Sequence, residues 1–308
     1  MLEFKGANMK QDVSPVSRPL DAAAAALAVV LCLSWGFNQV AIKLALPEIP
    51  PLIQAAFRST FGALVVVAWS RGRGVKLMQR DGTLVPGLVA GLLFGLEFLL
   101  IYRGLVWTSA SRAALFIYTA PFVVVIGARW FLPGDRFHKS QWLGLMLAFA
   151  GIAVALGMPT TGGDARQLIG DVMLVLAGIA WGATTLVIKA TRLTHAPFEK
   201  TLLYQLVVSA PMLALGAYVF GERVTAPPSA VALGALAYQT FWVVSLTYLA
   251  WFALIQRYSA SRLSAFTFLT PLFGVAAGHL VLGEPLTPAF AAAAVLVVGG
   301  LVLVNRPR

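Results

Sequence analysis

The sequence predicts an all-α integral membrane protein whose ten transmembrane helices form two inverted five-helix repeats. Composition is the first reason. Of 308 residues, 59% are hydrophobic and 11% are charged, with a mean hydropathy of +0.83, whereas a soluble domain carries about 25% charged residues. Internal repetition is the second reason, because motifs of the first half return in order 146 to 150 residues later. A repeat within so apolar a chain is typical of a membrane carrier built from two copies of one helical bundle.

Long segments without charge identify the spans. Residues 22–42, 201–221, 263–283 and 285–305 are each 21 residues without Asp, Glu, Lys or Arg. A helix needs about 20 residues to cross a hydrocarbon core of about 30 Å. Barrel strands would be about 10 residues long with alternating polarity, and no such alternation occurs. We therefore expect helices near 22–44, 52–70, 83–106, 110–131, 140–158, 168–190, 197–219, 229–254, 260–282 and 286–305.

The connections between the spans are short and rich in proline and glycine, as at 47–51 and 71–74. One longer linker, residues 159–167, is rich in Gly and Thr and falls where the two halves join. The predicted organisation in chain order is a cytoplasmic tail at 1–21, a first five-helix repeat at 22–158, the linker at 159–167, a second, inverted repeat at 168–305, and a cytoplasmic tail at 306–308.

Two motifs carry the repeat. The Trp-Gly pair at 35–36 returns at 181–182, and the Ser-Ala-Ser-Arg sequence at 109–112 returns at 259–262. Five predicted spans separate each motif from its copy. Because five is odd, the second half must enter the membrane from the opposite side, so the sequence predicts an inverted repeat and not a tandem one.

Basic residues indicate the orientation. With the N-terminus in the cytoplasm, seventeen of the 23 Lys and Arg residues fall at inner loops and helix ends, and six fall on the outer side. Basic residues accumulate in cytoplasmic loops, so both termini are predicted to be cytoplasmic, in a bacterial inner membrane. The net charge of +11 then reflects orientation, and we expect no nucleic-acid partner. The six outer residues are Lys43, Arg58, Arg103, Arg112, Arg166 and Arg223.

The paired Trp-Gly motifs, the Ser-Ala-Ser-Arg copies before an apolar helix with a central proline, and the closing Gly-Asp at 134–135 and Gly-Glu at 283–284 together resemble the drug/metabolite transporter superfamily. More narrowly, they resemble its EamA-type exporters, and the chain looks most similar to the YddG-type aromatic amino-acid exporters. The resemblance covers residues 22–305. It implies ten helices, a central cavity lined mainly by spans 1, 3, 4, 6, 8 and 9, and alternating access. Members of the superfamily carry amino acids, nucleosides, sugars or cationic drugs.

Polar side chains at mid-depth are candidate substrate contacts, because carriers with inverted repeats bind substrate near the midplane. The first span offers Asn38, and the sixth offers Trp181, Thr184 and Thr185. An unpaired amide in lipid costs several kcal/mol, so Asn38 must face protein or water. Either a hydrogen bond between helices or a substrate contact would satisfy it.

Glu97 is the one acidic residue far inside a predicted span. An ionisable residue within the membrane is a functional hypothesis by default. Glu97 can serve as a proton-coupling carboxylate or cation ligand, as a structural partner of Arg103 about two turns away, or as an edge residue at a thinned part of the bilayer. The corresponding position in the second half is Leu246 or Thr247, so this charge is not repeated in the second half.

Aromatic residues are plentiful in the spans, and Tyr118 and Trp242 are placed nearest mid-depth. Their rings are expected to stack on an aromatic or apolar substrate group or to hold a cation. The alternative is that they pack between helices or anchor the membrane interface.

Two prolines, Pro121 and Pro271, occupy matching positions near the middle of spans 4 and 9. Proline removes a helical hydrogen bond and produces a kink. Because both halves carry one, we interpret them as paired gating kinks; a static kink that shapes the bundle is the alternative.

Motifs for a cofactor or an energy-supplying domain are absent from the sequence. The three histidines lack metal-ligand spacing, no Gly-rich loop ends in Gly-Lys-Ser/Thr, and no Ser/His/Asp set can be placed at one depth. We therefore expect no metal, no cofactor and no enzymatic activity. Cys32 is the single cysteine, so no internal disulfide is expected.

Together these features predict a secondary transporter that exports amino acids, aromatic and neutral ones included, or related small metabolites. An exporter of cationic drugs is the first alternative, favoured if Glu97 lines the cavity. A membrane enzyme, a receptor or a channel are further alternatives. The expected partners are a small-molecule substrate and membrane lipid; the oligomeric state is left open, and a monomer is compatible with the sequence.

Overall fold

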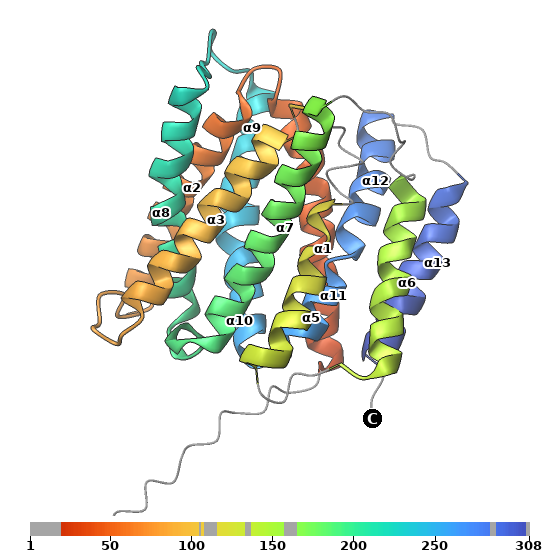
Figure 1. Cartoon of the computed structure of the whole chain (residues 1–308). Coiled ribbons are helices and arrows are strands. Elements are labelled where there is room, and N and C mark those ends of the chain that lie inside the picture. Colours follow the sequence, from red (N-terminus) through yellow and green to blue (C-terminus); the bar gives the residue numbers. More distant parts are fainter. Residues whose placement is uncertain are drawn as a thin grey trace, which may run out of the picture.

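The computed structural model describes residues 20–104, 106–107, 116–132, 137–156, 165–283 and 288–305, and every regular element in these residues is a helix. Figure 1 shows them as a bundle of roughly aligned helices. Seven described segments are long and apolar enough to cross a membrane. Five of them are α1 (Ala22–Ala45), α2 (Pro51–Gly72), α3 (Leu84–Gly104), α7 (Ala165–Ala190) and α8 (Phe198–Val219).

The other two long segments are composite helices. The first joins α9 (Ala230–Ala237), η2 (Tyr238–Thr247) and α10 (Tyr248–Arg257), and the second joins α11 (Ala260–Phe266) and α12 (Leu269–Leu282). Three further apolar helices are α5 (Ala120–Phe131), α6 (Lys139–Leu156) and α13 (Ala289–Asn305). A single 3-10 turn, η1 (Arg192–His195), precedes α8.

These helices confirm the prediction of an all-α integral membrane protein. The count of ten spans in an inverted repeat stays a prediction. The first part of the span expected at 110–131 and residues 159–164 of the expected linker lie outside the described residues, whereas residues 165–167 of that linker belong to the first turn of α7.

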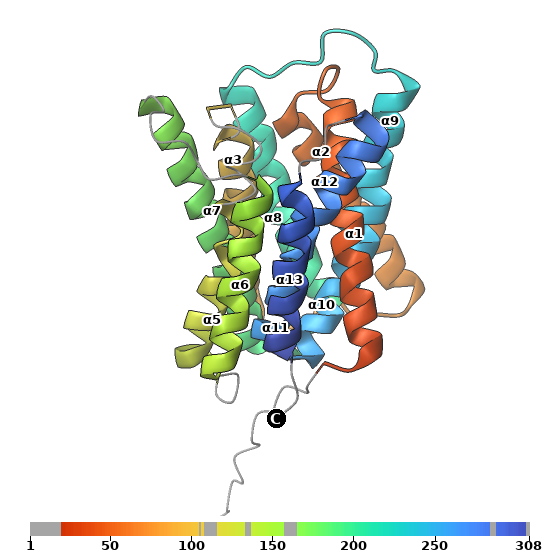
Figure 2. The same ribbon diagram turned by 90° about the vertical axis from the view of Figure 1, so that its right-hand side faces the viewer.

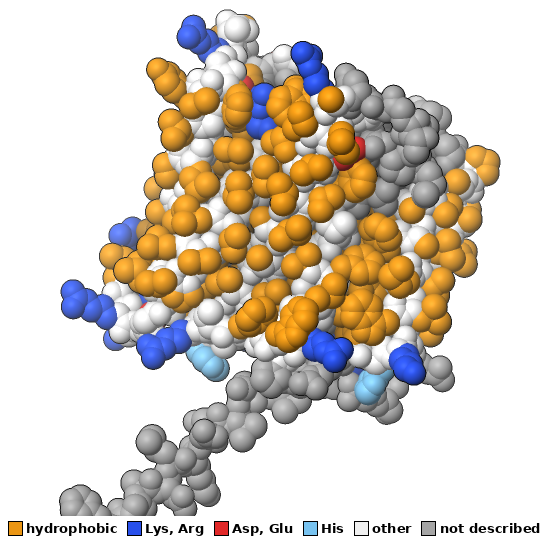
Figure 3. Space-filling model, in the orientation of Figure 1, with side chains coloured by type: hydrophobic (Ala, Val, Ile, Leu, Met, Phe, Trp, Pro, Cys, Tyr) orange, Lys and Arg blue, Asp and Glu red, His pale blue; other side chains and the backbone are white. Residues whose placement is uncertain are grey.

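The surface has the distribution that a bilayer requires. Figure 3 shows hydrophobic side chains over the middle of the visible face, with Lys and Arg near its upper and lower ends. Large apolar side chains such as Leu64, Val85, Leu215 and Val302 are each more than half exposed. A soluble monomer rarely exposes so continuous an apolar surface, so this face is suited to lipid.

Helix packing pairs elements that are far apart in the chain. Helix α6 packs along α13, as Figure 2 shows, and α2 packs on α8. Helix α1 packs on α12, while α7 packs on α5. In Figure 1, α1 and α7 run in opposite directions, and α1 begins on the same side on which α13 ends.

Both Trp-Gly motifs lie where two helices cross closely. A Cβ added at Gly36 would lie 2.7 Å from the Gly274 nitrogen and 2.8 Å from the Thr270 carbonyl oxygen of α12. At Gly182, a Cβ would lie 2.6 Å from the Val123 Cβ of α5. Only a residue without a side chain fits either crossing, which explains why both halves carry glycine there.

The two prolines differ from the simple mid-span kink that the sequence predicts. Each lies in the first turn of a new helical segment, Pro121 just after α5 begins and Pro271 just after α12 begins. Residues 118–119 and 267–268 form turns immediately before these segments. Proline costs little at a helix start, where its missing N–H has no helical acceptor. The chain therefore breaks the helix and restarts it at the proline.

Within the composite helix that joins α9, η2 and α10, η2 is a π-helix of 10 residues. The Ser245 hydroxyl donates to the Thr240 carbonyl five residues earlier, at 2.8 Å. Short π segments occur frequently at functional sites. No feature of the sequence predicted this one.

Candidate functional site

Four residues singled out from the sequence lie together. Tyr118, in the turn before α5, packs edge-to-face on Trp181 of α7, with ring centres 5.8 Å apart and an interplanar angle of 76°. Trp181, Pro121 and Thr185 line a narrow pocket. Its other lining residues are Ala120, Val124, Gly182, Ser264 and Thr267. The pocket thus combines aromatic, apolar and hydroxyl groups from α5, α7 and the α11 region.

The two threonines of α7 use their hydroxyl hydrogens within their own helix. Thr184 Oγ1 donates to the Ala180 carbonyl at 2.9 Å, and Thr185 Oγ1 donates to the Trp181 carbonyl at 3.3 Å. Both residues are buried. Each hydroxyl oxygen keeps lone pairs that can accept a hydrogen bond, but Thr185 lines the pocket and Thr184 does not.

Asn38 of α1 is buried, in agreement with the requirement that its amide faces protein. Its Oδ1 atom has no hydrogen-bond partner in the described chain. The residue lies half a turn beyond Gly36, where α1 crosses α12. Asn38 therefore leaves one buried acceptor open.

Trp242 lies apart from the Tyr118 and Trp181 rings. It belongs to η2, its side chain is 43% exposed, and its Nε1 donates to Ser34 Oγ at 3.0 Å. A tryptophan with one exposed face and a satisfied N–H is suited to the bundle surface. The structure therefore does not bring Trp242 to the pocket.

Glu97 of α3 is buried, and Arg103 is not its partner. The Arg103 guanidinium lies 3.7 Å from the centre of the Phe220 ring and close to Glu222. The cationic neighbour of Glu97 is Arg58 of α2, which is 1% exposed. The expectation that Arg58 lies at the outer surface is therefore wrong: its side chain is turned into the bundle.

Aromatic rings surround this pair of buried charges. The Arg58 guanidinium lies 4.1 Å from the centre of the Phe98 ring. The Tyr248 hydroxyl of α10 lies within electrostatic reach of Arg58, Glu97 and Tyr102. Further rings continue the group, with Phe94 6.1 Å and Trp35 6.0 Å from Tyr248. We call Trp35, Phe94, Phe98, Tyr102, Tyr248 and Trp251 the aromatic cluster.

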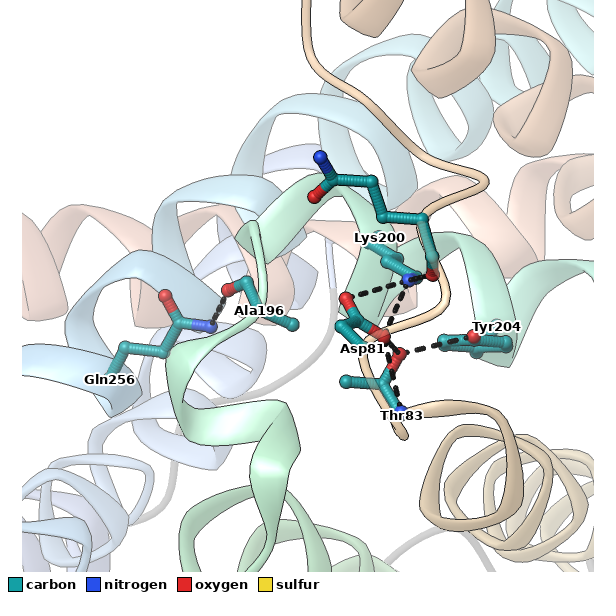
Figure 4. Close-up of polar contacts among 7 residues, drawn as sticks. Asp81, Thr83, Ala196, Lys200, Tyr204 and Gln256 are labelled. Atoms are coloured by element: carbon teal, nitrogen blue, oxygen red, sulfur yellow. Dashed lines mark hydrogen bonds and ion pairs between the residues drawn. The ribbon is translucent and has the colours of Figure 1, made fainter.

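Asp81 and Lys200 connect the two halves at the end of the bundle where α1 begins. Figure 4 shows Lys200 of α8 facing Asp81 in the α2–α3 connection. Lys200 Nζ donates to both Asp81 carboxylate oxygens, at 2.8 and 2.9 Å, and to the Gln79 carbonyl at 2.9 Å. Thr83 completes the contact, because its hydroxyl donates to Asp81 and lies 3.2 Å from the Tyr204 hydroxyl.

Electrostatics reinforce this contact. The hydrogen bond from Lys200 lowers the pKa of the Asp81 carboxyl well below its ordinary value, and the Thr83 hydroxyl contributes in the same direction. Lys200 is almost fully buried, whereas Asp81 keeps some solvent exposure. On the same side, Gln256 of α10 donates to the Leu193 and Ala196 carbonyls around η1, at 3.1 and 2.8 Å. The α2–α3 connection is thus attached to the second half by polar contacts.

The sequence did indicate that Arg58 is unusual, because it is the one charged residue in the span predicted at 52–70. The prediction counted Arg58 among the positive charges on the outer side of the membrane and therefore missed that its side chain turns inward towards Glu97.

In the parts of the chain that the structure describes, no three His, Cys, Asp or Glu side chains gather in a way that could hold a metal ion.

Comparisons with known proteins agree with this architecture. The model of the EamA-like transporter family matches residues 22–157 and again residues 168–306. The chain is 28% identical to "Uncharacterized transporter YvbV" of Bacillus subtilis, over 91% of either chain. It is 25% identical to a "Probable amino-acid metabolite efflux pump" of Salmonella typhimurium, over 89% of this chain and 92% of that one.

A solved crystal structure has the same fold. It aligns with a TM-score of 0.80, covers 92% of this chain and 98% of its own, and is 22% identical in sequence. At this identity the likeness concerns the fold alone.

Proposed function

The chain belongs to the EamA-like transporter family, and from this premise we propose that it is a secondary transporter exporting amino acids, aromatic and neutral, or related small metabolites. The observation that carries the substrate class is the pocket lined by Trp181 and Thr185, with the Tyr118 ring packed on Trp181. Aromatic faces suit the flat or apolar side chain of such a substrate. The relative named as an amino-acid metabolite efflux pump supports the same class.

We also propose that the helices form ten spans in two inverted five-helix repeats. The packing of α1 on α12 has its counterpart in the packing of α7 on α5, as exchange of the halves requires. The opposite directions of α1 and α7 in Figure 1 support inversion. In this arrangement both termini are cytoplasmic in a bacterial inner membrane, because most of the basic residues then face inward.

Alternating access would use the two broken spans. The segments that begin near Pro121 and Pro271 can change angle at the preceding turns, because no helical hydrogen bond to the proline nitrogen has to break. The contact between Asp81 and Lys200 would hold the cytoplasmic ends of the two halves together when that side is closed. Substrate would then be released towards the other side.

Counterflow tests this proposal. The purified protein in liposomes is loaded with one unlabelled amino acid, and uptake of labelled amino acids from a panel of aromatic, neutral and charged ones is followed. We expect saturable exchange of aromatic and neutral members, which separates a carrier from a pore. Failure to exchange any amino acid of the panel would reject the proposed substrate class.

Export of cationic drugs is the second candidate, because Glu97 is a buried acid in a span. The nearby Arg58 argues against it, since its positive charge opposes that of a cationic ligand. If cationic drugs are the substrates, Glu97→Gln should abolish their efflux. Unchanged efflux in this variant would exclude Glu97 as the group that binds cationic drugs.

A further inference from the structure

Arg58 is a buried cation whose hydrogen-bonding capacity is only partly used, since its side chain interacts with the Tyr248 hydroxyl while two of its nitrogens have no partner. Its side chain is 1% exposed and is the largest fully buried side chain of the described residues. Its Nε and Nη2 atoms have no hydrogen-bond partner. Burying a charged group without partners costs much more than burying a neutral one. A protein that maintains such a group has a reason other than packing.

The two unused donors form one recognition edge. Nε and Nη2 lie on the same side of the planar guanidinium, where their N–H groups point in parallel and match the two oxygens of a carboxylate. The guanidinium carbon lies over the Phe98 ring, 4.1 Å from its centre, which restricts the position of the group. Arg58 therefore presents a pair of parallel N–H donors along this edge.

Glu97 does not occupy this fork. The two side chains are electrostatic neighbours, but they form no ion pair within 4.0 Å. Arg58 lies seven residues after the start of α2 and Glu97 seven residues before the end of α3, which places both about 10 Å from the same end of the bundle. A separated positive and negative group at one depth matches a ligand that carries both charges.

The internal repeat shows that the fold does not need these charges. Helices α2 and α8 have the same length, and their bounds differ by 147 residues at both ends. This shift turns Arg58 into Gln205, and the position that corresponds to Glu97 is Leu246 or Thr247, so neither counterpart is charged. The second half therefore builds the same helices without either charge. If helix packing alone required these charges, the second half would be expected to carry them as well.

We propose that Arg58 binds the carboxylate of an α-amino acid through its Nε and Nη2 edge, while Glu97 receives the ammonium group. This inference rests on the proposed function and assigns the head-group subsite to α2 and α3. The aromatic cluster then faces the remainder of the ligand, with Tyr248 and Tyr102 beside the charges and Trp35 and Phe94 further along. Tyr118 and Trp181 belong to the same hydrophobic cluster as Trp35 and Phe94, so the pocket beside Trp181 receives the far end of the substrate side chain.

Substrate analogues test the proposal without altering the protein. Competition with labelled phenylalanine counterflow is measured for phenylalanine, its amide, its decarboxylated amine and its deaminated acid. We expect the amide and the amine, which lack the carboxylate, to compete at least tenfold more weakly than phenylalanine. The deaminated acid should also be weaker, because Glu97 then faces no ammonium group.

Variants test whether Arg58 is the group that distinguishes phenylalanine from its amide. Arg58→Gln should lose most phenylalanine exchange and bind phenylalanine and its amide with nearly equal strength. Arg58→Lys retains the charge without the planar fork, so it should recover only part of the discrimination. Arg103→Gln is the matched control, because Arg103 also stacks on an aromatic ring but lies at the end of α3. The control should discriminate as the unmodified protein does.

The outcomes separate the inference from the proposed function. No exchange of any amino acid by the unmodified protein would overturn both. Exchange with equal competition by phenylalanine and its amide would overturn the inference and leave the transport function standing. A folded Arg58→Gln variant that still prefers phenylalanine to its amide as strongly as the unmodified protein would also overturn the inference and leave the transport function standing. If Arg58→Gln does not fold, the analogue series on the unmodified protein still decides the question.

Discussion

Ser59 of α2 and Ser209 of α8 are 150 residues apart in the chain and share a hydrogen bond of 3.1 Å between their hydroxyl oxygens. Both are buried where α2 packs on α8. This hydrogen bond is therefore a direct polar contact between the first and the second half of the chain, inside the bundle.

The first prediction concerns this contact. Ser59→Ala and Ser209→Ala should each lower stability in detergent, and the double variant should be no less stable than the worse single one. Hydrogen bonds between membrane helices contribute about 0.6 kcal/mol on average, so a coupling energy near that size is expected from a double-mutant cycle. Strictly additive effects of the two substitutions would contradict the contact.

The second prediction concerns the crossing of α1 and α12. Gly36→Ala forces a Cβ to within 2.7 Å of the Gly274 nitrogen, and the cost of such overpacking is about 1–3 kcal/mol. Gly299→Ala is the control, because a Cβ there meets no atom within 4 Å. Thermal unfolding in detergent should show a lower midpoint for Gly36→Ala only. Equal midpoints for both variants would show that the helices do not approach this closely.

Composition and internal repetition were sufficient to predict the helical membrane fold, because both follow from the cost of exposing backbone and charge to lipid. Turn residues and runs without charge placed the helices closely: the span expected at 22–44 is α1, and that at 197–219 is α8. The breaks before Pro121 and Pro271 and the π-helix at 238–247 were not predicted. They depend on how one helix packs on another, which sequence periodicity does not encode.

The candidate site was predicted less completely for a related reason. Polar and aromatic residue types indicated which side chains to consider, but not which way they point. Trp181 and Tyr118 meet, whereas Trp242 lies on the outer face of η2. Charge counting placed Arg58 at an outer surface, and only the packing of α2 shows that it turns towards Glu97.

The third prediction concerns the ion pair between Asp81 and Lys200. Asp81→Asn leaves the nearly buried Lys200 ammonium without its carboxylate, so the unfolding midpoint should fall. The folded-state pKa of Asp81 lies below the ordinary value of 3.8, so the carboxylate stabilises the fold fully above that value. This contribution is lost as pH decreases through the lower folded-state pKa.

A pH series measures this contribution. The difference in unfolding midpoint between the unmodified protein and Asp81→Asn should be constant at neutral and mildly acidic pH and should shrink below pH 3.8. Asp81→Glu is a useful comparison, because it retains the charge and lengthens the side chain. A difference that grows on acidification would show that Asp81 is not stabilised in its ionised form.

The last prediction separates two tryptophans that the sequence treats alike. Trp181→Ala removes the ring that Tyr118 contacts and opens the pocket wall, so amino-acid counterflow should fall by at least tenfold in apparent affinity. Trp242→Ala removes a ring that is 43% exposed and hydrogen-bonded to Ser34, so exchange should change by less than twofold.

Both variants are reconstituted at equal protein content, and initial rates are measured over a range of substrate concentrations. Unfolding midpoints of both variants in detergent are compared as well, so that a loss of packing at Trp181 is distinguished from the loss of a contact with the substrate. An equal loss in the two variants would therefore contradict the assignment of Trp181 to the substrate pocket.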